Sequence, residues 1–266
     1  MLILLPPSES KTRPAEGPTL DLAELTLPGL NPTRQRVLEA LLKLCSTDRA
    51  RARTLLGLSV LQDDEVASNA ALLTEPTAPA IEIFSGVLYN NLGAANLSTA
   101  SQRWLNATSL IGSGLFGFIA PHDRIPVYRL AGDVTLPQVG SLPTLWRPAL
   151  AEVLPERTGS GVILDCRSQQ YAAMWQPTEK LRDHTVVLRV LQRTLVDGVE
   201  RLRIVSHHNK ATKGLLVREL AKVQAKPRNV AGLVDIVHDL GFEARVEATP
   251  YGGWQLDLVT DPVAVA

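Results

Sequence analysis

Short apolar segments that end abruptly in polar or glycine-rich loops constrain the fold of this chain most strongly. Residues 2–5 stop at Pro6-Pro7, residues 108–111 lead into a glycine-rich turn, and residues 162–165 lead into a polar loop. Short apolar runs bounded by turn signals are typical of buried strands. Since loops that follow such strands often carry functional groups, we expect a binding site at the strand ends.

The rest of the chain alternates between strand and helix patterns of unequal length. Further strands are expected at 80–89, where the segment runs into a glycine turn, in a hairpin of 185–191 and 201–205 around Asp197-Gly198, and at 242–247 and 254–259. Helices are expected at 142–154, from 213 or 214 to 223, and at 230–240. This mixture predicts an α/β fold, with a single compact domain over 1–266 and a mixed twisted sheet.

A helical excursion is expected at about 33–75. Apolar residues recur at helical spacing after Thr33, with Arg34 and Arg36 between them, and Thr47-Asp48 offers an N-cap for a second helix through 56. Gly57 ends that helix and Ser59 can cap a third, from 60 to about 73, which gives the outline of a helix-hairpin-helix. In that element, backbone N–H groups at a glycine hairpin can hold a DNA phosphate. An ordinary helix pair with a glycine C-cap has the same pattern, so both interpretations stay open.

Glycines at 112, 114 and 117 have the G-x-G-x-x-G spacing of a dinucleotide fingerprint. Pro121 argues against that interpretation, because the helix that should follow the last glycine could continue for only about one turn. Two other interpretations stay open. The turn either presents backbone N–H groups to an anion of another kind, or it is a tight turn that packs its apolar residues.

Composition excludes several classes of protein and site. The 266-residue chain is 45% hydrophobic and has a formal net charge of zero, so no bulk field indicates a nucleic-acid or membrane partner. The apolar start ends at Pro6, too early for a signal peptide or membrane span, and we expect a cytoplasmic protein without a membrane partner. Its two cysteines lack ligand spacing, and adjacent His207 and His208 would face opposite sides of a strand. Neither a metal site nor a cofactor is therefore predicted.

Five separated blocks, in the same order along nearly the whole chain, resemble the YaaA peroxide-stress protein family. They are Leu-Ile-Leu-Leu-Pro-Pro-Ser-Glu-Ser-Lys-Thr at 2–12, Phe-Ser-Gly-Val-Leu-Tyr at 84–89, Ser-Gly-Leu-Phe-Gly through Pro-Val-Tyr-Arg-Leu at 113–130, Asp-Cys-Arg-Ser-Gln-Gln-Tyr at 165–171, and Val-Ser-His-His-Asn-Lys-Ala-Thr-Lys-Gly at 205–214. The resemblance implies a compact α/β fold with a positively charged cleft, a helix-hairpin-helix-like element and a cytoplasmic role in surviving hydrogen peroxide. It also implies binding of double-stranded DNA and a lowering of the free iron that drives peroxide damage. Gln170 stands where the family often has an acid.

The matching blocks supply the candidate site residues: Ser8, Lys11, Tyr89, Ser113, Gly114, Arg129, Ser168, Tyr171, Lys210 and Lys213. All but the last two follow predicted strands, where sites on sheets form. The three lysines and Arg129 would give a positive cluster suited to phosphate, since lysine acts as a point charge and arginine can bind two oxygens at once.

Two functions follow from these residues. The first is a monomer that binds double-stranded DNA through the positive cleft and helps to limit iron-driven oxidative damage. The second is an enzyme acting on a phosphate-bearing nucleotide or nucleobase, with Lys11 or Lys210 activating or orienting that small molecule. A deep pocket holding all four cations would favour the enzyme, whereas a long open groove reaching the 33–75 helices would favour DNA.

Overall fold

A mixed eight-stranded sheet forms the centre of the computed structural model, which describes residues 1–159, 161–196, 199–204, 206–250 and 252–261. Seven strands follow the order β11-β12-β9-β8-β1-β3-β4, and β10 pairs with β9. The bounds of these strands are β1 Leu2–Leu5, β3 Ser109–Ser113, β4 Gly117–Ile119, β8 Ile163–Asp165, β9 Thr185–Val196, β10 Val199–Arg203, β11 Glu243–Ala248 and β12 Trp254–Thr260. The predicted mixed α/β fold is confirmed.

The five central strands of this sheet run parallel, and antiparallel partners flank them. Leu4 of β1 pairs in parallel with Leu110 of β3 and Asp165 of β8. Every residue of β1, β3 and β8 is buried, as expected of parallel strands covered on both faces. Because these strands are parallel, the loops after β1 and β8 both leave the sheet at the C-terminal ends of the strands. The site lies at these strand ends.

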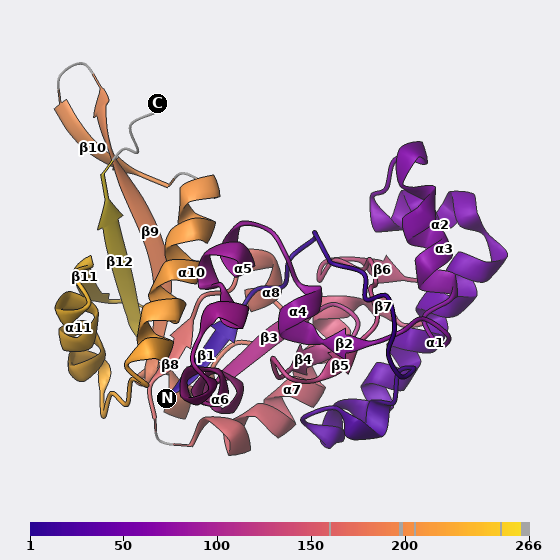
Figure 1. Ribbon diagram of the computed structural model, residues 1–266, viewed down its shortest axis with the longest axis horizontal. Helices are drawn as coiled ribbons and strands as arrows, with labels where there is room; N and C mark the ends of the chain where they lie inside the picture. Colours follow the sequence, from indigo (N-terminus) through magenta and orange to yellow (C-terminus); the bar gives the residue numbers. More distant parts are fainter. Residues whose placement is uncertain (160, 197–198, 205, 251, 262–266) are drawn as a thin grey trace.

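Helices cover both faces of the sheet (Figure 1). The longer ones are α6 Thr99–Thr108, α7 Leu142–Thr158, α10 Ser206–Lys222 and α11 Val230–Asp239. Short helices and strands complete the connections: α4 Ala80–Ile83, α5 Val87–Leu92, α8 Gln169–Ala172, α9 Glu179–Arg182, β2 Ala78–Pro79, β5 Arg124–Ile125, β6 Thr135–Leu136 and β7 Gly140–Ser141. Helix α10 packs on β9 and α5. No helix in the described part of the chain is long and apolar enough to cross a membrane.

The predicted helical excursion is present, at the end of the molecule opposite the β9–β10 hairpin (Figure 1). It consists of α1 Asn31–Thr47, α2 Arg49–Leu56, a short 3-10 turn Val60–Gln62 and α3 Asp63–Ala70. Asp48 caps α2 by accepting a hydrogen bond from the Arg51 N–H at 2.9 Å. Gly57 ends α2 with φ +65, and Ser59 forms a capping box with Gln62.

The strand expected at 80–89 is wrong, because this segment forms helices α4 and α5. Ala80 and Ile83 are buried at the i, i+3 spacing of one helix face, and the buried Phe84 that follows α4 is extended and forms a β-bridge with Lys11. Gly86, with φ +94, separates the two helices. Packing of this short face against the rest of the protein overrides the strand propensity of Ile and Phe.

The structure also bears on the predicted strand position of the two adjacent histidines and on the predicted hairpin. His207 and His208 lie in the first turn of α10, which begins earlier than expected, and not in a strand. Their side chains lie outside the described part of the chain. The hairpin of β9 and β10 is confirmed by its antiparallel pairing, although its turn, Asp197-Gly198, also falls outside the described residues.

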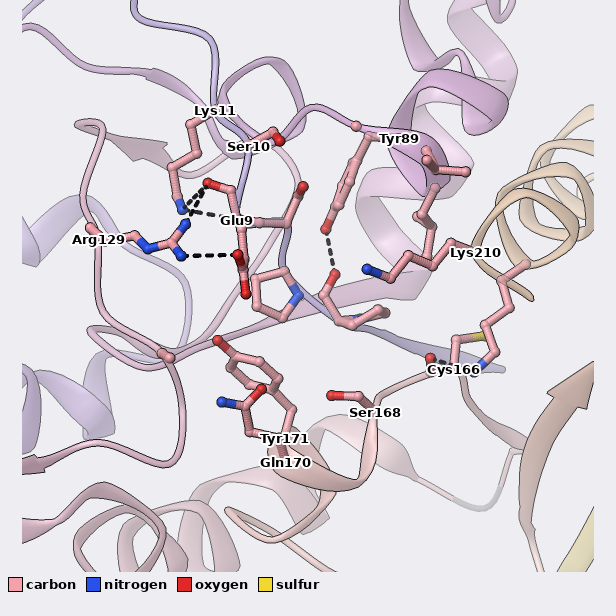
Figure 2. A pocket seen from close by; sticks show the side chains of 18 of the residues that line it. Glu9, Ser10, Lys11, Tyr89, Arg129, Cys166, Ser168, Gln170, Tyr171 and Lys210 are labelled. Carbon is pink, nitrogen blue, oxygen red and sulfur yellow. Dashed lines mark hydrogen bonds and ion pairs between the residues drawn. The ribbon is translucent and has the colours of Figure 1, made fainter. Parts of the chain in front are cut away.

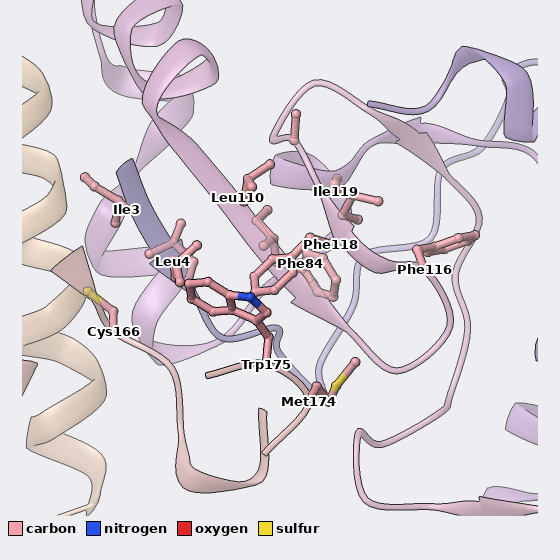
Figure 3. Close-up of a cluster of buried hydrophobic side chains, with 14 of the residues drawn as sticks. Ile3, Leu4, Phe84, Leu110, Phe116, Phe118, Ile119, Cys166, Met174 and Trp175 are labelled. Carbon is pink, nitrogen blue, oxygen red and sulfur yellow. The ribbon is translucent and has the colours of Figure 1, made fainter. Parts of the chain in front are cut away.

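The apolar core continues beneath the loop that follows β8 (Figure 3). Trp175 is only 1% exposed and packs near Leu4, Phe84 and Phe118. The guanidinium of Arg167 lies 5.4 Å from the Trp175 ring centroid and 5.6 Å from that of Phe118. Contacts on one side of the loop after β8 therefore anchor it in the apolar core. The other side of this loop faces a cavity.

Candidate functional site

A cavity of about 530 Å³ lies where the loops after β1 and β8 leave the sheet. Its walls come from residues 6–11, 86–89, 128–131 and 166–171 and from α10. The cavity brings together eight of the ten candidate residues, which are Ser8, Lys11, Tyr89, Arg129, Ser168, Tyr171, Lys210 and Lys213. Figure 2 shows Lys11 and Arg129 on one side of this cavity and Lys210 on the other.

Lys11 extends into the cavity over aromatic rings. Its Nζ lies 4.7 Å from the Tyr128 ring centroid and 5.4 Å from that of Phe84. It donates to the carbonyl of Ser8 at 3.0 Å. Burial, followed by the nearby positive charge of Arg129, lowers the pKa of Lys11 to about 8.

Arg129 is held beside Lys11 by contacts at both its backbone and its guanidinium. The Asn69 side chain of α3 accepts from the Arg129 N–H and donates to its carbonyl, both at 2.8 Å. The guanidinium donates to the Glu9 carboxylate at 2.9 Å. Helix α3 thus supports the position of Arg129 from behind the cavity.

Helix α10 supplies the cations of the opposite wall. Lys213 is buried, and its Nζ donates to the carbonyl of Cys166 at 3.0 Å. Burial lowers the pKa of Lys213, although the nearby Cys166 and Asp165 act in the opposite direction. Lys210, one turn earlier on the helix, is exposed. The cavity therefore offers one accessible and one buried lysine on this side.

The tyrosines of the cavity stay protonated and serve as walls and hydrogen-bond donors. The Tyr89 hydroxyl donates to the carbonyl of Pro6 at 2.8 Å, which fixes the loop after β1. Burial raises the pKa values of Tyr89, Tyr128 and Tyr171 well above the usual range of a phenol. None of them can therefore act as a base at neutral pH.

The glycine turn does not line the cavity. Ser113 Oγ accepts from the Phe116 N–H at 2.9 Å and bonds to the Tyr128 hydroxyl at 2.7 Å. A Cβ added to Gly114 would lie 2.6 Å from the carbonyl oxygen of Leu130. A Cβ added to Gly117 would lie 2.8 Å from the ring of Trp146. The glycine spacing thus permits close packing, and Ser113 and Gly114 lie behind the wall that Tyr128 forms.

A buried ion pair between Asp165 and Arg167, which was not predicted from the sequence, holds the loop after β8. Nε and Nη2 of Arg167 donate to the two carboxylate oxygens of Asp165 at 2.9 and 2.7 Å. The same guanidinium donates to the carbonyls of Tyr171 and Trp175 at 3.1 and 3.0 Å. The signal in the sequence was an aspartate at the end of a buried strand, two residues before an arginine. The pair positions the loop that carries Ser168.

Asn209 also lines the cavity and was not among the expected residues. Its Oδ1 atom is buried and has no hydrogen-bond partner among the described residues. Buried acceptors are nearly always satisfied in folded proteins, so such an atom needs an explanation. The sequence signal for Asn209 was its position directly before Lys210, in one of the blocks that resemble the YaaA family. The cavity lining therefore contains a side-chain amide as well as several cations and hydroxyls.

The hairpin candidates Gly57 and Ser59 lie in the excursion, and none of the residues from 33 to 75 appears among those that line the cavity. The first turn of α3 after this hairpin is acidic, with Asp63, Asp64 and Glu65. Arg49 and Arg53 of α2 both pair with Asp63, at 3.4 and 2.7 Å. A DNA-binding helix-hairpin-helix is not shown, since these carboxylates oppose a phosphate at that helix start.

Both cysteines are expected to resist oxidation and alkylation in the folded protein. Burial raises the pKa of Cys45 to about 11 and that of Cys166 to about 12, and only the thiolate reacts with peroxide. Mass spectrometry after iodoacetamide treatment should find neither thiol modified in the native state and both modified in guanidinium chloride. Labelling of native Cys166 by a sulfenic-acid reagent after peroxide treatment would contradict this expectation.

Within the described residues, no group of three or more His, Cys, Asp or Glu side chains could hold a metal ion. The polar groups that line the cavity are mainly cations, hydroxyls and side-chain amides, together with the Glu9 carboxylate that pairs with Arg129. Such an arrangement suits phosphate, which lysine and arginine bind through charge-assisted hydrogen bonds.

Comparison with known proteins gives consistent matches. The family model described as peroxide stress protein YaaA matches residues 1–247. A UPF0246 protein of Streptomyces coelicolor is 44% identical over 99% of this chain and 100% of its own length. A UPF0246 protein of Corynebacterium glutamicum is 38% identical over 97% of this chain and 100% of its own, and one of Salinispora tropica is 31% identical over 91% and 88%.

Proposed function

This chain belongs to the peroxide stress protein YaaA family, and we propose that it acts by binding double-stranded DNA, which helps to limit iron-driven oxidative damage. The observation that carries the proposal is the gathering of four cations, Lys11, Arg129, Lys210 and Lys213, around one cavity. In a chain of zero net charge this is a local positive field. The proposed acting form is a cytoplasmic monomer. No metal-ligand cluster in the described part of the chain supports the proposed limiting of iron-driven damage.

Lys210 is the cation of the cavity that a duplex would meet first. It is exposed, whereas Lys213 is buried and Arg129 is engaged by Glu9. A duplex is too wide to enter a cavity of 530 Å³, so its phosphates would be held at the mouth. Contacts to phosphate release counterions and depend steeply on salt.

Replacing Lys210 with alanine is expected to weaken duplex binding several-fold and to reduce the slope of log K against log salt by about one. Lys222→Ala is the matched control, since Lys222 lies at the end of the same helix and pairs with Glu219 away from the cavity. Fluorescence anisotropy of a labelled duplex across a salt series measures both quantities. Binding that is absent, or independent of salt, would refute the proposal.

The enclosure of the cations supports a second candidate, an enzyme acting on a phosphate-bearing nucleotide or nucleobase. All four cations line one cavity, whose volume lies within the range of small-molecule sites, and residues 33–75 do not extend it into a groove. Calorimetric titration with a nucleoside monophosphate distinguishes the two candidates. Saturable binding that Lys210→Ala weakens, in a protein with no affinity for duplex, would favour the enzyme.

A further inference from the structure

Lys11 is fixed in place by backbone pairing on both sides. It forms a bridge with Phe84, the Thr12 N–H donates to the carbonyl of Ile83 at 2.8 Å, and the Ser85 N–H donates to the carbonyl of Ser10 at 3.0 Å. The two aromatic rings beneath its side chain then limit where Nζ can lie. Such a constrained amine is suited to a reaction that needs a defined approach.

No carboxylate pairs with Lys11 anywhere in the described ranges of the chain. The hydrogen bonds of its Nζ go to backbone carbonyls of the loop after β1, and Glu9, the acid in that loop, engages Arg129 instead. The charged groups that face Lys11 are Arg129, which disfavours its positive charge, and Glu9 and Glu65, which favour it less strongly. The phenol of Tyr128 beneath it stays neutral at physiological pH.

These surroundings leave part of the Lys11 population as a free amine at neutral pH. With its pKa lowered to about 8, a larger share of Lys11 is uncharged at neutral pH than of a lysine with the ordinary pKa of about 10.4. A lysine held mainly to bind phosphate gains nothing from losing its charge. Desolvated lysines are the ones that act as nucleophiles toward carbonyl groups.

The opposite side of the cavity suits the rest of a sugar phosphate. Lys210 and Lys213 offer positive charge for the phosphate, and Ser168 offers a hydroxyl. Asn209 lines the same cavity, and a side-chain amide there can hydrogen-bond to a sugar hydroxyl. Cations, a hydroxyl and the Lys11 amine thus line one cavity of about 530 Å³ (Figure 2).

We propose that Lys11 forms an imine with the aldehyde of a phosphate-bearing sugar held in this cavity. The Nζ lone pair attacks the carbonyl carbon, and the carbonyl oxygen takes up a proton while the nitrogen loses one, which gives a carbinolamine. That hydroxyl then leaves with a second proton from nitrogen as water, and the C=N bond forms. The inference rests on the proposed function, because it requires the cavity to bind a phosphate-bearing ligand.

Reductive trapping tests this reaction. The full-length protein is incubated with 2-deoxyribose 5-phosphate and sodium cyanoborohydride, which reduces an imine to a stable secondary amine, and the modified lysine is located by peptide mass spectrometry. Lys11 should carry most of the adduct, and unphosphorylated 2-deoxyribose should give several-fold less. The initial trapping rate should rise between pH 7 and 9 and then level off, at lower pH than for an amine with the ordinary lysine pKa of about 10.4.

Matched variants separate chemistry from binding. Lys11→Arg keeps the positive charge but cannot form the imine, so it should abolish the dominant adduct, whereas Lys222→Arg should leave it unchanged. Site mapping on the unmodified protein does not depend on any variant folding. Labelling of Lys11 that is no greater than that of Lys222 would overturn the inference. If duplex DNA or the sugar phosphate still binds in that case, the proposed function stands and only the imine is refuted; if neither binds, both fail.

Discussion

Replacing Arg34 with methionine is expected to lower the free energy of unfolding by about 3–5 kcal/mol. Arg34 is completely buried, and its guanidinium donates to the carbonyls of Thr26, Phe116 and Phe118 at 2.7, 3.1 and 2.8 Å. It also donates to the side chain of Asn31 at 2.8 Å. Methionine has similar length but no donor, so three buried carbonyls lose a partner, each at a cost of about 1–3 kcal/mol.

Burial disfavours the charge of Arg34, and the nearby Asp123 carboxylate offsets part of that cost. Burial lowers the pKa of Arg34 to about 10, while Asp123 acts in the opposite direction. Asp123 is itself buried and accepts from the N–H and hydroxyl of Thr26 at 3.0 and 2.7 Å and from the Ala120 N–H at 2.9 Å. Without Arg34, this buried carboxylate would lose a favourable charge interaction, which adds to the loss.

Urea denaturation measures the effect, with the m-value as a check that the native and unfolded states stay comparable. Arg36→Met is the matched control, because Arg36 lies on the same helix and is exposed, and its change should stay within about 0.5 kcal/mol. A loss below about 1 kcal/mol for Arg34→Met would show that water or repacking satisfies the freed carbonyls.

Arg34 also illustrates what the sequence could not reveal. It occurs between apolar residues of an amphipathic helix, where arginine is ordinarily solvated, and nothing local indicates that it is buried. Its partners Phe116 and Phe118 are far away in sequence, in the glycine turn. The glycine spacing of this turn also permits an anion-site interpretation, because the spacing alone does not show that Leu130 and Trp146 pack against the glycines. Both features depend on long-range contacts.

Other parts of the structure were predictable because they depend on local pattern. The apolar runs at β1 and β8 end in polar loops, and parallel strands bring those loops to one edge, which explains why Ser8, Lys11 and Ser168 share a cavity. Lys210 could be placed there only through the resemblance to a family, since no local signal joins α10 to that edge. Asn209 was missed because an unsatisfied acceptor exists only in three dimensions.

Replacing Gly214 with alanine is expected to cost about 2–3 kcal/mol of stability and to weaken duplex binding. Gly214 lies in α10 where this helix crosses α5, and an added Cβ would lie 2.2 Å from the carbonyl oxygen of Leu88 and 3.0 Å from the N of Leu92. Both contacts are backbone atoms, so no side-chain rotation can relieve them and the two helices must separate. Tyr89 is on α5 and Lys210 is on α10, so their separation would widen the cavity.

Gly232→Ala provides the matched control for this substitution. Gly232 lies in α11, and the nearest atom to its added Cβ is Asn229 Oδ1 at 3.4 Å, an ordinary contact. Alanine favours helix over glycine by up to about 1 kcal/mol, so this variant should be unchanged or more stable.

Thermal unfolding measures the stability of both variants, and duplex anisotropy at a temperature where each is folded measures their binding separately. Duplex affinity should fall roughly tenfold for Gly214→Ala alone, equivalent to about 1.4 kcal/mol of lost contacts. Equal stability and affinity of the two variants would mean that the crossing of α5 and α10 can relax without moving the cations, and that the cavity does not depend on it.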